Sequence, residues 1–199
     1  MHTGFDYCLG DPGDNIVQYQ IQPGFFVAAP DEGVGAATPV VPPFVDTGPI
    51  PAQMFHLFNF ELGGALGPCN VQSEVRFAVV DQIGGPVVAF SGAYAEATCV
   101  LTGEVHPYDY ENAVFRRVMP NREFYFRSGG GALEASLGWS YINLNDKNIT
   151  GGGMQTYSMG LNWYLHRYAK FQFVVIPVTL ERGGASSAAV AAARTQVEF

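Results

Sequence analysis

The sequence predicts an all-β protein, built as an antiparallel meander, and two observations lead to that prediction. Segments of about ten residues alternate apolar with polar or small side chains, which is the period of a strand with one apolar face. The composition agrees, because the 199 residues include 15 Phe and 10 Tyr, which favour strands, and 24 Gly and 13 Pro, which favour turns. We expect one domain that covers residues 1–199.

The alternation is clearest in the segment Cys69–Val79. Val71 and Phe77 fall on one face of this segment, and Arg76 falls on the other. The same parity predicts about nine strands, at Thr3–Leu9, Asn15–Val27, Gln53–Leu66, Cys69–Val79, Val87–Leu101, Leu133–Tyr141, Tyr157–Leu165, Lys170–Leu180 and Ala188–Phe199.

Lipid is the favoured neighbour of the apolar face, although a soluble β-sandwich alternates in the same way. No run of 18 apolar residues is present, so a transmembrane helix is not expected, but a membrane-spanning strand needs only about 9–11 residues. The last strand closes on an aromatic residue, which resembles the C-terminal signature of outer-membrane β-barrels. Aromatic residues near strand ends are expected at the membrane interfaces, namely Trp139, Tyr141, Trp163, Tyr164 and Phe199.

The connections also sort as a barrel requires, with long loops outside and short turns on the periplasmic side. The predicted outer connections are Glu181–Ser187, Asn145–Gly153, Asp81–Pro86 and the long loop Ala28–Ala52. The predicted periplasmic turns are His166–Tyr168, Gly67-Pro68 and Gly10–Asp14. The segment Thr102–Gly131 is long yet counts as periplasmic, so we expect that it folds toward the lumen or contains a pair of strands.

Charge and motifs exclude several functions. With 18 acidic and 10 basic residues the net charge is -8, so nucleic acid is not an expected partner. Cys8, Cys69 and Cys99 show no ligand spacing, and we predict that they are small apolar side chains. The polar residues of Glu104–Glu111 match no metal-binding loop. No catalytic motif is present, so we expect no enzyme, no cofactor and no metal site.

Specific segments resemble a known family. They are Trp139–Asp146, Gly151-Gly152 and Gly160–Leu165, with Leu101–Glu104, Pro107–Asp109 and Val114–Val118 upstream. These segments resemble the C-terminal hairpin, and the region before it, of the phosphate-selective porin O and P family. The resemblance implies a sixteen-stranded, homotrimeric channel in the bacterial outer membrane, inserted by the barrel-assembly machinery, that passes phosphate or related anions. About nine strands would form only the C-terminal part of that even-stranded barrel.

Basic residues are the candidates for an anion pathway. Arg76 and Arg194 lie on polar faces, which predicts a lumenal position. Pairing of such an arginine with a nearby glutamate is the open alternative to attracting anions. The remaining candidates are Arg116, Arg117, Arg122 and Arg127. They would form an anion-attracting patch if their segment folds inward, and a solvated loop balanced by acidic neighbours is the open alternative. The family commonly has basic residues where this chain has Gly138 and Gly153. The resemblance therefore supports the barrel fold more strongly than it supports selectivity for phosphate.

The predicted function is therefore passive diffusion of small anions, phosphate first, across a bacterial outer membrane. The segment Met1–Asp6 has neither the basic nor the apolar region of a secretion signal, so we expect the C-terminal part of a longer protein. Two alternatives stay open. One is a truncated fragment without transport of its own, and the other is a soluble β-sandwich binding module.

Overall fold

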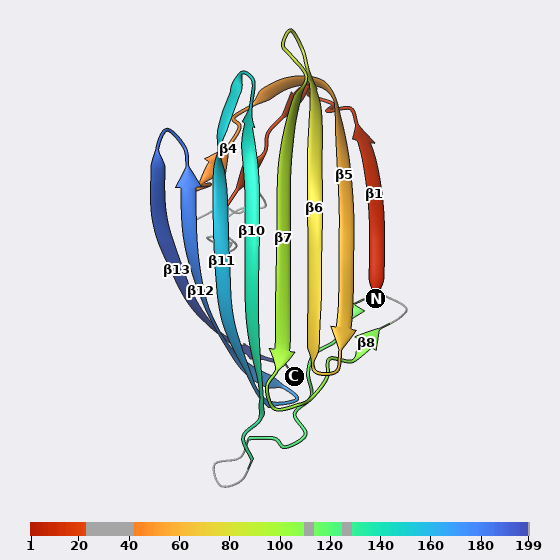
Figure 1. Ribbon diagram of the computed structural model, residues 1–199, viewed down its shortest axis with the longest axis vertical. Coiled ribbons are helices and arrows are strands. Elements are labelled where there is room, and N and C mark those ends of the chain that lie inside the picture. Colours follow the sequence, from red (N-terminus) through yellow and green to blue (C-terminus); the bar gives the residue numbers. More distant parts are fainter. Residues whose placement is uncertain (23–41, 110–113, 125–128, 199) are drawn as a thin grey trace.

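A computed structural model describes residues 1–22, 42–109, 114–124 and 129–198, and these form an antiparallel meander (Figure 1). The main sheet has nine strands, and the short strand β2 (Ile16–Val17) pairs with β5 away from the main path. The long strands follow the chain in spatial order: β1 (His2–Gly10), β5 (Ile50–Leu66), β6 (Cys69–Gln82), β7 (Val88–Val100), β10 (Ala132–Asp146), β11 (Ile149–His166), β12 (Ala169–Glu181) and β13 (Ala185–Val197). The all-β prediction is confirmed.

The two ends of the sheet differ in their connections. We call the end where β13 finishes the C-terminal end, at the bottom of Figure 1, and the other the opposite end. Short turns after β5 and β11 and the long segment 101–131 lie at the C-terminal end. The turns after β6, β10 and β12 and the described residues 11–22 and 42–49 lie toward the opposite end. The connections predicted to be outer therefore share one end of the sheet, with Gly10–Asp14 as the exception because it lies there too, and residues 28–41 of the predicted loop Ala28–Ala52 lie outside the described residues.

The exception arises from a wrong strand prediction. The alternation of Asn15–Val27 predicts one long strand, but its described residues form only β2 and β3 (Gln20–Ile21), and residues 23–27 lie outside the described part. β3 pairs with β4 (Val45–Asp46) rather than with the main sheet. Short strands that fold over a sheet show the same alternation as spanning strands, so parity alone misplaces the turn Gly10–Asp14.

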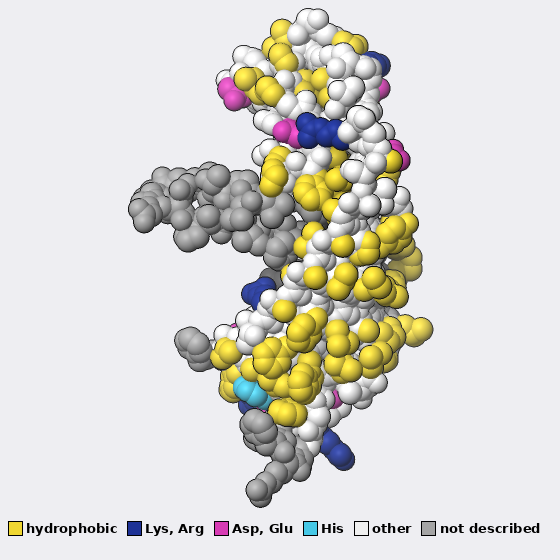
Figure 2. All heavy atoms as spheres, turned by 90° about the vertical axis from the view of Figure 1, so that its left-hand side faces the viewer, with side chains coloured by type: hydrophobic (Ala, Val, Ile, Leu, Met, Phe, Trp, Pro, Cys, Tyr) yellow, Lys and Arg dark blue, Asp and Glu magenta, His cyan; other side chains and the backbone are white. Residues whose placement is uncertain are grey.

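One face of the sheet, which we call the outward face, carries exposed apolar side chains. The cross-strand pairs of this face join Phe60 to Phe5 and to Val75, and Met159 to Leu137 and to Val175. These side chains are all exposed. Figure 2 views the sheet from the β13 edge and shows hydrophobic side chains along the outward side, with the charged side chains of that side nearer its two ends. A monomeric soluble protein rarely exposes so continuous an apolar surface.

The other face of the sheet, which we call the inward face, holds the apolar core. This core lies near the opposite end defined above. Val80, Val88 and Ile50 are fully buried there beneath β2, β3 and β4. Backbone hydrogen bonds hold this cover in place, because Thr47 N donates to Tyr19 O at 3.0 Å and Ala52 N donates to the carbonyl of residue 15 at 2.9 Å. The described residues between β1 and β5 therefore fill part of the inward face.

A disulfide joins β6 to β7 and corrects the cysteine prediction. Cys69 and Cys99 are direct cross-strand partners with Cα atoms 4.0 Å apart, and their sulfur atoms are bonded. Cys8 is unpaired and exposed. The prediction of three separate apolar side chains was wrong for the bonded pair, because a separation of 30 residues gave no sign that the start of β6 lies beside the end of β7.

The segment 101–131 meets both expectations stated for it. It contains a short pair of strands outside the main sheet, β8 (Tyr108–Asp109) and β9 (Val114–Phe115). It also folds onto the inward face, where Val118 is fully buried beside Val100, Ala132 and Tyr164. Described parts of both long connections therefore lie over the inward face, one near each end of the sheet.

Candidate functional site

The inward face is polar in its middle part. In one cross-strand row, Asn59 pairs with Asp6 on one side and with Arg76 on the other. In the next row, Glu74 pairs with Glu61 and with Tyr94. Side chains of a strand alternate between faces, so the same parity that exposes apolar residues outward places these polar residues inward.

Arg76 lies on the inward face, but its charge is already paired. Its Nη2 lies 2.7 Å from Glu74 Oε2, and its Nε donates to Asn59 Oδ1 at 3.1 Å. Tyr94 donates its hydroxyl proton to Glu74 Oε1 at 2.8 Å. Arg76 therefore adds little unpaired positive charge to this part of the face.

A cavity of about 980 Å³ separates this polar row from the segment Gln18–Gln22. Arg76, Glu74 and Tyr94 line it from the sheet, and Tyr19 lines it from the segment. The Tyr19 hydroxyl is buried without a hydrogen-bond partner in the described part of the chain, and burial raises its pKa. Tyr19 thus presents a neutral side chain to the cavity.

A buried carboxylate joins the segment 101–131 to the sheet at the C-terminal end. Glu134 on β10 is 2% exposed. It accepts hydrogen bonds from the Tyr164 hydroxyl at 2.8 Å and from Asn162 Nδ2 at 2.8 Å. His106 Nε2 approaches the other carboxylate oxygen at 2.5 Å. These donors offset the desolvation of a buried charge.

Both ring nitrogens of His106 face oxygen acceptors, which favours the protonated ring. Nδ1 lies 2.8 Å from the Arg116 carbonyl oxygen, and Nε2 faces the carboxylate of Glu134. A neutral imidazole can donate only one of these two hydrogen bonds. The hydrogen bond to Glu134 raises the pKa of His106 above its ordinary value of 6.5, against the opposing effects of burial and of Lys170.

We expect the docking of segment 101–131 to weaken as the pH rises. Because the pKa of His106 is higher in the folded state than in the unfolded chain, its contribution is complete below about pH 6.5. It is lost as the pH passes upward through the raised value. Thermal unfolding of the wild type at pH 6 and pH 9, beside His106→Gln, measures this contribution. The variant should lose much of the difference between the two pH values, and an equal difference in both proteins would contradict the assignment.

Three basic side chains, which we call the basic cluster, lie around Lys170 at the C-terminal end of the inward face. Lys170 Nζ lies 5.5 Å from the centre of the Tyr164 ring, and Arg117 Cζ lies 5.8 Å from the same centre. Arg194 on β13 lies two residues from Gln196, the cross-strand partner of Lys170, and interacts electrostatically with that lysine. The cluster is Arg117, Lys170 and Arg194.

Arg117 also holds a carboxylate from the end of the chain. Its Nη1 lies 3.0 Å from Glu198 Oε1, and its side chain is 15% exposed whereas that of Glu198 is 51% exposed. The guanidinium nitrogens are buried and make no hydrogen bond of good geometry within the described residues. A buried cation that contacts an exposed carboxylate is suited to exchange that partner for another oxyanion.

The structure brings together only two of the six predicted arginines, Arg117 and Arg194. Arg76 lies apart in the middle of the inward face, and Arg127 lies outside the described residues. The other two, Arg116 and Arg122, are exposed, and their backbone carbonyls accept hydrogen bonds from His106 and Gly131.

Lys170 is the member of the cluster that sequence reasoning missed. Its position on β12 has the same parity as Gln172 and Val174, which the strand prediction Lys170–Leu180 already placed on one face. Applying that parity to lysine as well as arginine would have found it. Glu134 and His106 could not have been paired in this way, because they are 28 residues apart on different elements.

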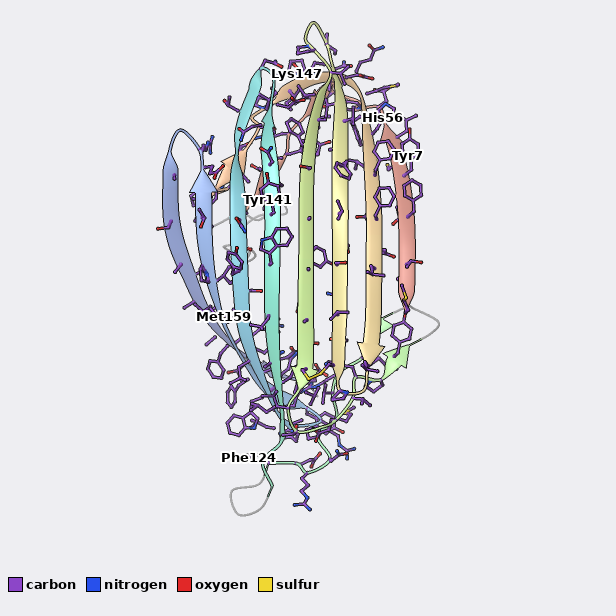
Figure 3. All side chains as sticks on the ribbon, in the orientation of Figure 1. Tyr7, His56, Phe124, Tyr141, Lys147 and Met159 are labelled. Carbon is purple, nitrogen blue, oxygen red and sulfur yellow. A yellow bond between two sulfur atoms is a disulfide. The ribbon has the colours of Figure 1, made fainter. Side chains whose placement is uncertain are left out.

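The predicted interface aromatics fall in several places. Trp139 and Tyr141 lie on the outward face with stacked rings 6.5 Å apart, but in the interior of β10, because that strand continues to Asp146, beyond the predicted end (Figure 3). Trp163 lies near the end of β11 and contacts Phe124 at 5.1 Å between ring centres.

Tyr164 differs from the expected interface position. It is 3% exposed on the inward face, because adjacent residues of a strand point to opposite sides and Trp163 points outward. The terminal aromatic Phe199 lies outside the described residues.

Two features of other protein classes are absent from the described ranges. Residues 1–22, 42–109, 114–124 and 129–198 contain no cluster of His, Cys, Asp and Glu suited to hold a metal ion. Within the same ranges, no helix is long and apolar enough to cross a membrane.

An antiparallel meander with an apolar outward face and a polar inward face defines the class of β-barrel walls. The family model for phosphate-selective porin O and P matches residues 44–199. The chain therefore belongs to the phosphate-selective porin O and P family, a family of channels rather than of enzymes.

Two curated relatives are also similar. Porin O of Pseudomonas aeruginosa is 23% identical over 206 residues, which cover 92% of this chain and 44% of that protein. An uncharacterized protein of Caulobacter vibrioides is 25% identical over 119 residues, which cover 60% of this chain and 24% of that protein. The chain spans less than half the length of either relative.

Proposed function

We propose that this chain forms part of the wall of a bacterial outer-membrane channel through which small anions such as phosphate diffuse passively. The observation that supports this most is the separation of the two faces. Exposed Phe60, Met159 and Phe173 lie outward, and the basic cluster lies inward at the C-terminal end. Lipid would cover the first surface and water the second.

The basic cluster is the part of the inward face best suited to attract anions. Two of its cations, Arg117 and Lys170, lie over the ring of the buried Tyr164, where a lower local dielectric strengthens electrostatic attraction. The planar fork of an arginine binds two oxygens of a phosphate, and Lys170 supplies a compact charge. Several weak contacts in succession allow an anion to enter and also to leave.

Other parts of the inward face contribute less to this preference. Arg76 is paired with Glu74, and Gly138 on this face carries no basic side chain. Selectivity in this chain therefore depends on the C-terminal end of the face more than on its middle.

The test is ion selectivity in a planar bilayer with a KCl gradient. Arg117→Gln and Lys170→Gln should each lower the permeability ratio of chloride to potassium by several-fold. Each change removes one positive charge from the pathway and leaves Glu134 unchanged. The matched control is Arg182→Gln, which removes the same charge from an exposed turn at the opposite end. Equal shifts in all three variants, or none in the first two, would contradict the assignment of selectivity to the basic cluster.

The remaining partners follow from the same proposal. Outer-membrane lipid would cover the outward face, the barrel-assembly machinery would insert the strands, and complete barrels would associate as homotrimers. A soluble β-sandwich is less well supported, since it needs a second sheet over the outward face, and no described segment lies there.

A further inference from the structure

The cavity between the sheet and the segment Gln18–Gln22 lies apart from the proposed anion site. Its volume of about 980 Å³ falls within the range of about 300–1,000 Å³ that is typical of small-molecule pockets. Arg117, Lys170 and Arg194 of the basic cluster are not among the described residues that line it. Figure 1 shows the chain after β1 crossing the sheet toward β4, and this crossing forms the roof of the cavity.

Hydrogen bonds hold the roof in place. The backbone N–H of Tyr19 donates to Thr47 Oγ1 at 3.0 Å, and Gln18 Nε2 donates to Asp46 Oδ1 at 2.8 Å. The Tyr19 ring lies edge-to-face against the ring of Phe90 on the sheet, with 5.6 Å between the ring centres. A ligand would therefore enter a cavity that is already formed, without the cost of ordering its walls.

Two neighbouring rows of inward side chains make part of the floor. The polar row consists of cross-strand partners on β1, β5 and β6, namely Asp6, Asn59 and Arg76. The apolar row consists of partners on β5, β6 and β7, namely Leu57, Ala78 and Phe90. The rows are two residues apart along each strand, which corresponds to about 7 Å. A molecule with a polar group at one end and an apolar body can therefore contact both rows at once.

The charges that line the cavity favour a cation. Among the described lining residues the charged ones are Asp6, Glu74 and Arg76, so two carboxylates face one guanidinium. Arg76 and Glu74 pair with each other at 2.7 Å. Asp6 accepts one long hydrogen bond, from Asn59 Nδ2 at 3.5 Å. The carboxylate of Asp6 is therefore the charge that a ligand would meet.

We propose that this cavity binds a small organic amine with an apolar body. The ammonium group lies at the polar row beside Asp6, and the apolar body lies over Leu57 and Ala78. The cavity opens on the inward side of the sheet, since the side chain of Arg76 at the polar row is 70% exposed. This site is separate from the basic cluster and does not depend on conduction of anions.

Three indole compounds test the charge preference on a constant apolar ring. Tryptamine carries an ammonium group, tryptophol a neutral hydroxyl, and indole-3-propionate a carboxylate. Titration calorimetry in detergent micelles at pH 7 measures their binding to the complete barrel that contains this sheet, with empty micelles as the blank. Tryptamine should bind most tightly and indole-3-propionate several-fold more weakly, because the carboxylate of Asp6 attracts the first and repels the second.

Removing the charge of Asp6 tests the polar row. Asp6→Asn should weaken tryptamine binding by about two- to five-fold, since water screens an exposed carboxylate, and should leave tryptophol binding unchanged. The matched control is Asp11→Asn, which removes the same charge from an exposed position that does not line the cavity. This control should bind all three compounds as the wild type does.

A bulky residue at Gly92 tests the cavity itself. Gly92 is the cross-strand partner of Arg76 and lines the cavity. A Cβ atom there would lie 3.5 Å from the nearest backbone oxygen, which is an ordinary contact, so the sheet can accept a side chain. Gly92→Phe should weaken both tryptamine and tryptophol several-fold. Gly63→Phe, on the inward face outside the cavity, is the matched control and should leave binding unchanged. Circular dichroism checks that both variants keep the sheet.

Two results would overturn the proposal. If indole-3-propionate binds as tightly as tryptamine, the site does not select a cation. If folded Gly92→Phe binds tryptamine as the wild type does, the amine lies outside this cavity. Failure of the channel proposal is distinguishable, because a barrel that shows the expected binding but carries no ionic current would overturn the proposed function and keep the amine site.

Discussion

Replacing Met159 by arginine should destabilise the chain in a lipid bilayer by about 2–4 kcal/mol, the cost of an arginine on the lipid-facing side of a membrane strand. Met159 is 50% exposed on the outward face, in the interior of β11, between Leu137 and Val175 on the neighbouring strands. A charged side chain there must leave water or distort the bilayer. Urea unfolding from lipid vesicles, followed by tryptophan fluorescence, measures the change in free energy.

The adjacent residue supplies the control. Ser158 lies on the inward face of the same strand, opposite Gly138, so arginine at this position projects toward water. Ser158→Arg should cost less than half as much as Met159→Arg. If the two variants are equally stable, or if the order is reversed, the outward face is not the face that meets lipid.

Removing the disulfide should lower the free energy of unfolding by about 3–4 kcal/mol, because a crosslink restricts the conformations of the unfolded chain. The bond closes a loop across a sequence separation of 30 residues. The double substitution Cys69→Ala and Cys99→Ala avoids leaving a free thiol and keeps two small apolar side chains on the outward face. Denaturant unfolding of the wild type and the double variant measures the loss.

Reductant separates the disulfide from the effect of the substitutions. Full reduction should lower the stability of the wild type toward that of the double variant and leave the variant unchanged. If the oxidised wild type and the double variant unfold at the same denaturant concentration, the bond does not stabilise the fold.

Parity predicted most of the sheet. The segments Cys69–Val79, Leu133–Tyr141 and Tyr157–Leu165 all lie within observed strands, with their apolar side chains outward. The predicted ends of the strands were less accurate. The predicted strand Tyr157–Leu165 begins in fact at Ile149, because the glycine and polar residues before Tyr157 continue the hydrogen-bonded ladder. Alternation reports a face with apolar neighbours, but it does not report where hydrogen bonding stops.

Contacts between distant segments were not visible in the sequence. The Cys69–Cys99 bond needs the register of β6 against β7, and the contact of His106 with Glu134 needs the inward path of a long connection. A single sequence contains the period of each strand but not the position of each loop. The strand Asn15–Val27 failed for the same reason, since its described part pairs over the inward face.

The candidate site was predicted in part. Strand parity placed Arg194, and an inward turn of its segment was the condition for including Arg117; the structure brings both close to Lys170. For Arg76 the structure shows the alternative of pairing with a nearby glutamate, since Glu74 lies on the same face of the same strand. Counting both signs of charge on a face, rather than arginines alone, would have separated the paired cation from the basic cluster.

Our central claim is that this sheet forms part of a water-filled, anion-preferring path across a membrane. The most direct measurement is the reversal potential of the current that a complete barrel containing this sheet carries across a planar bilayer under a KCl gradient, with phosphate then added. We predict discrete conductance steps, a reversal potential on the chloride side, and a chloride current that falls as phosphate competes for the basic cluster. A reversal potential on the potassium side that phosphate does not change, or no current from inserted protein, would contradict the claim.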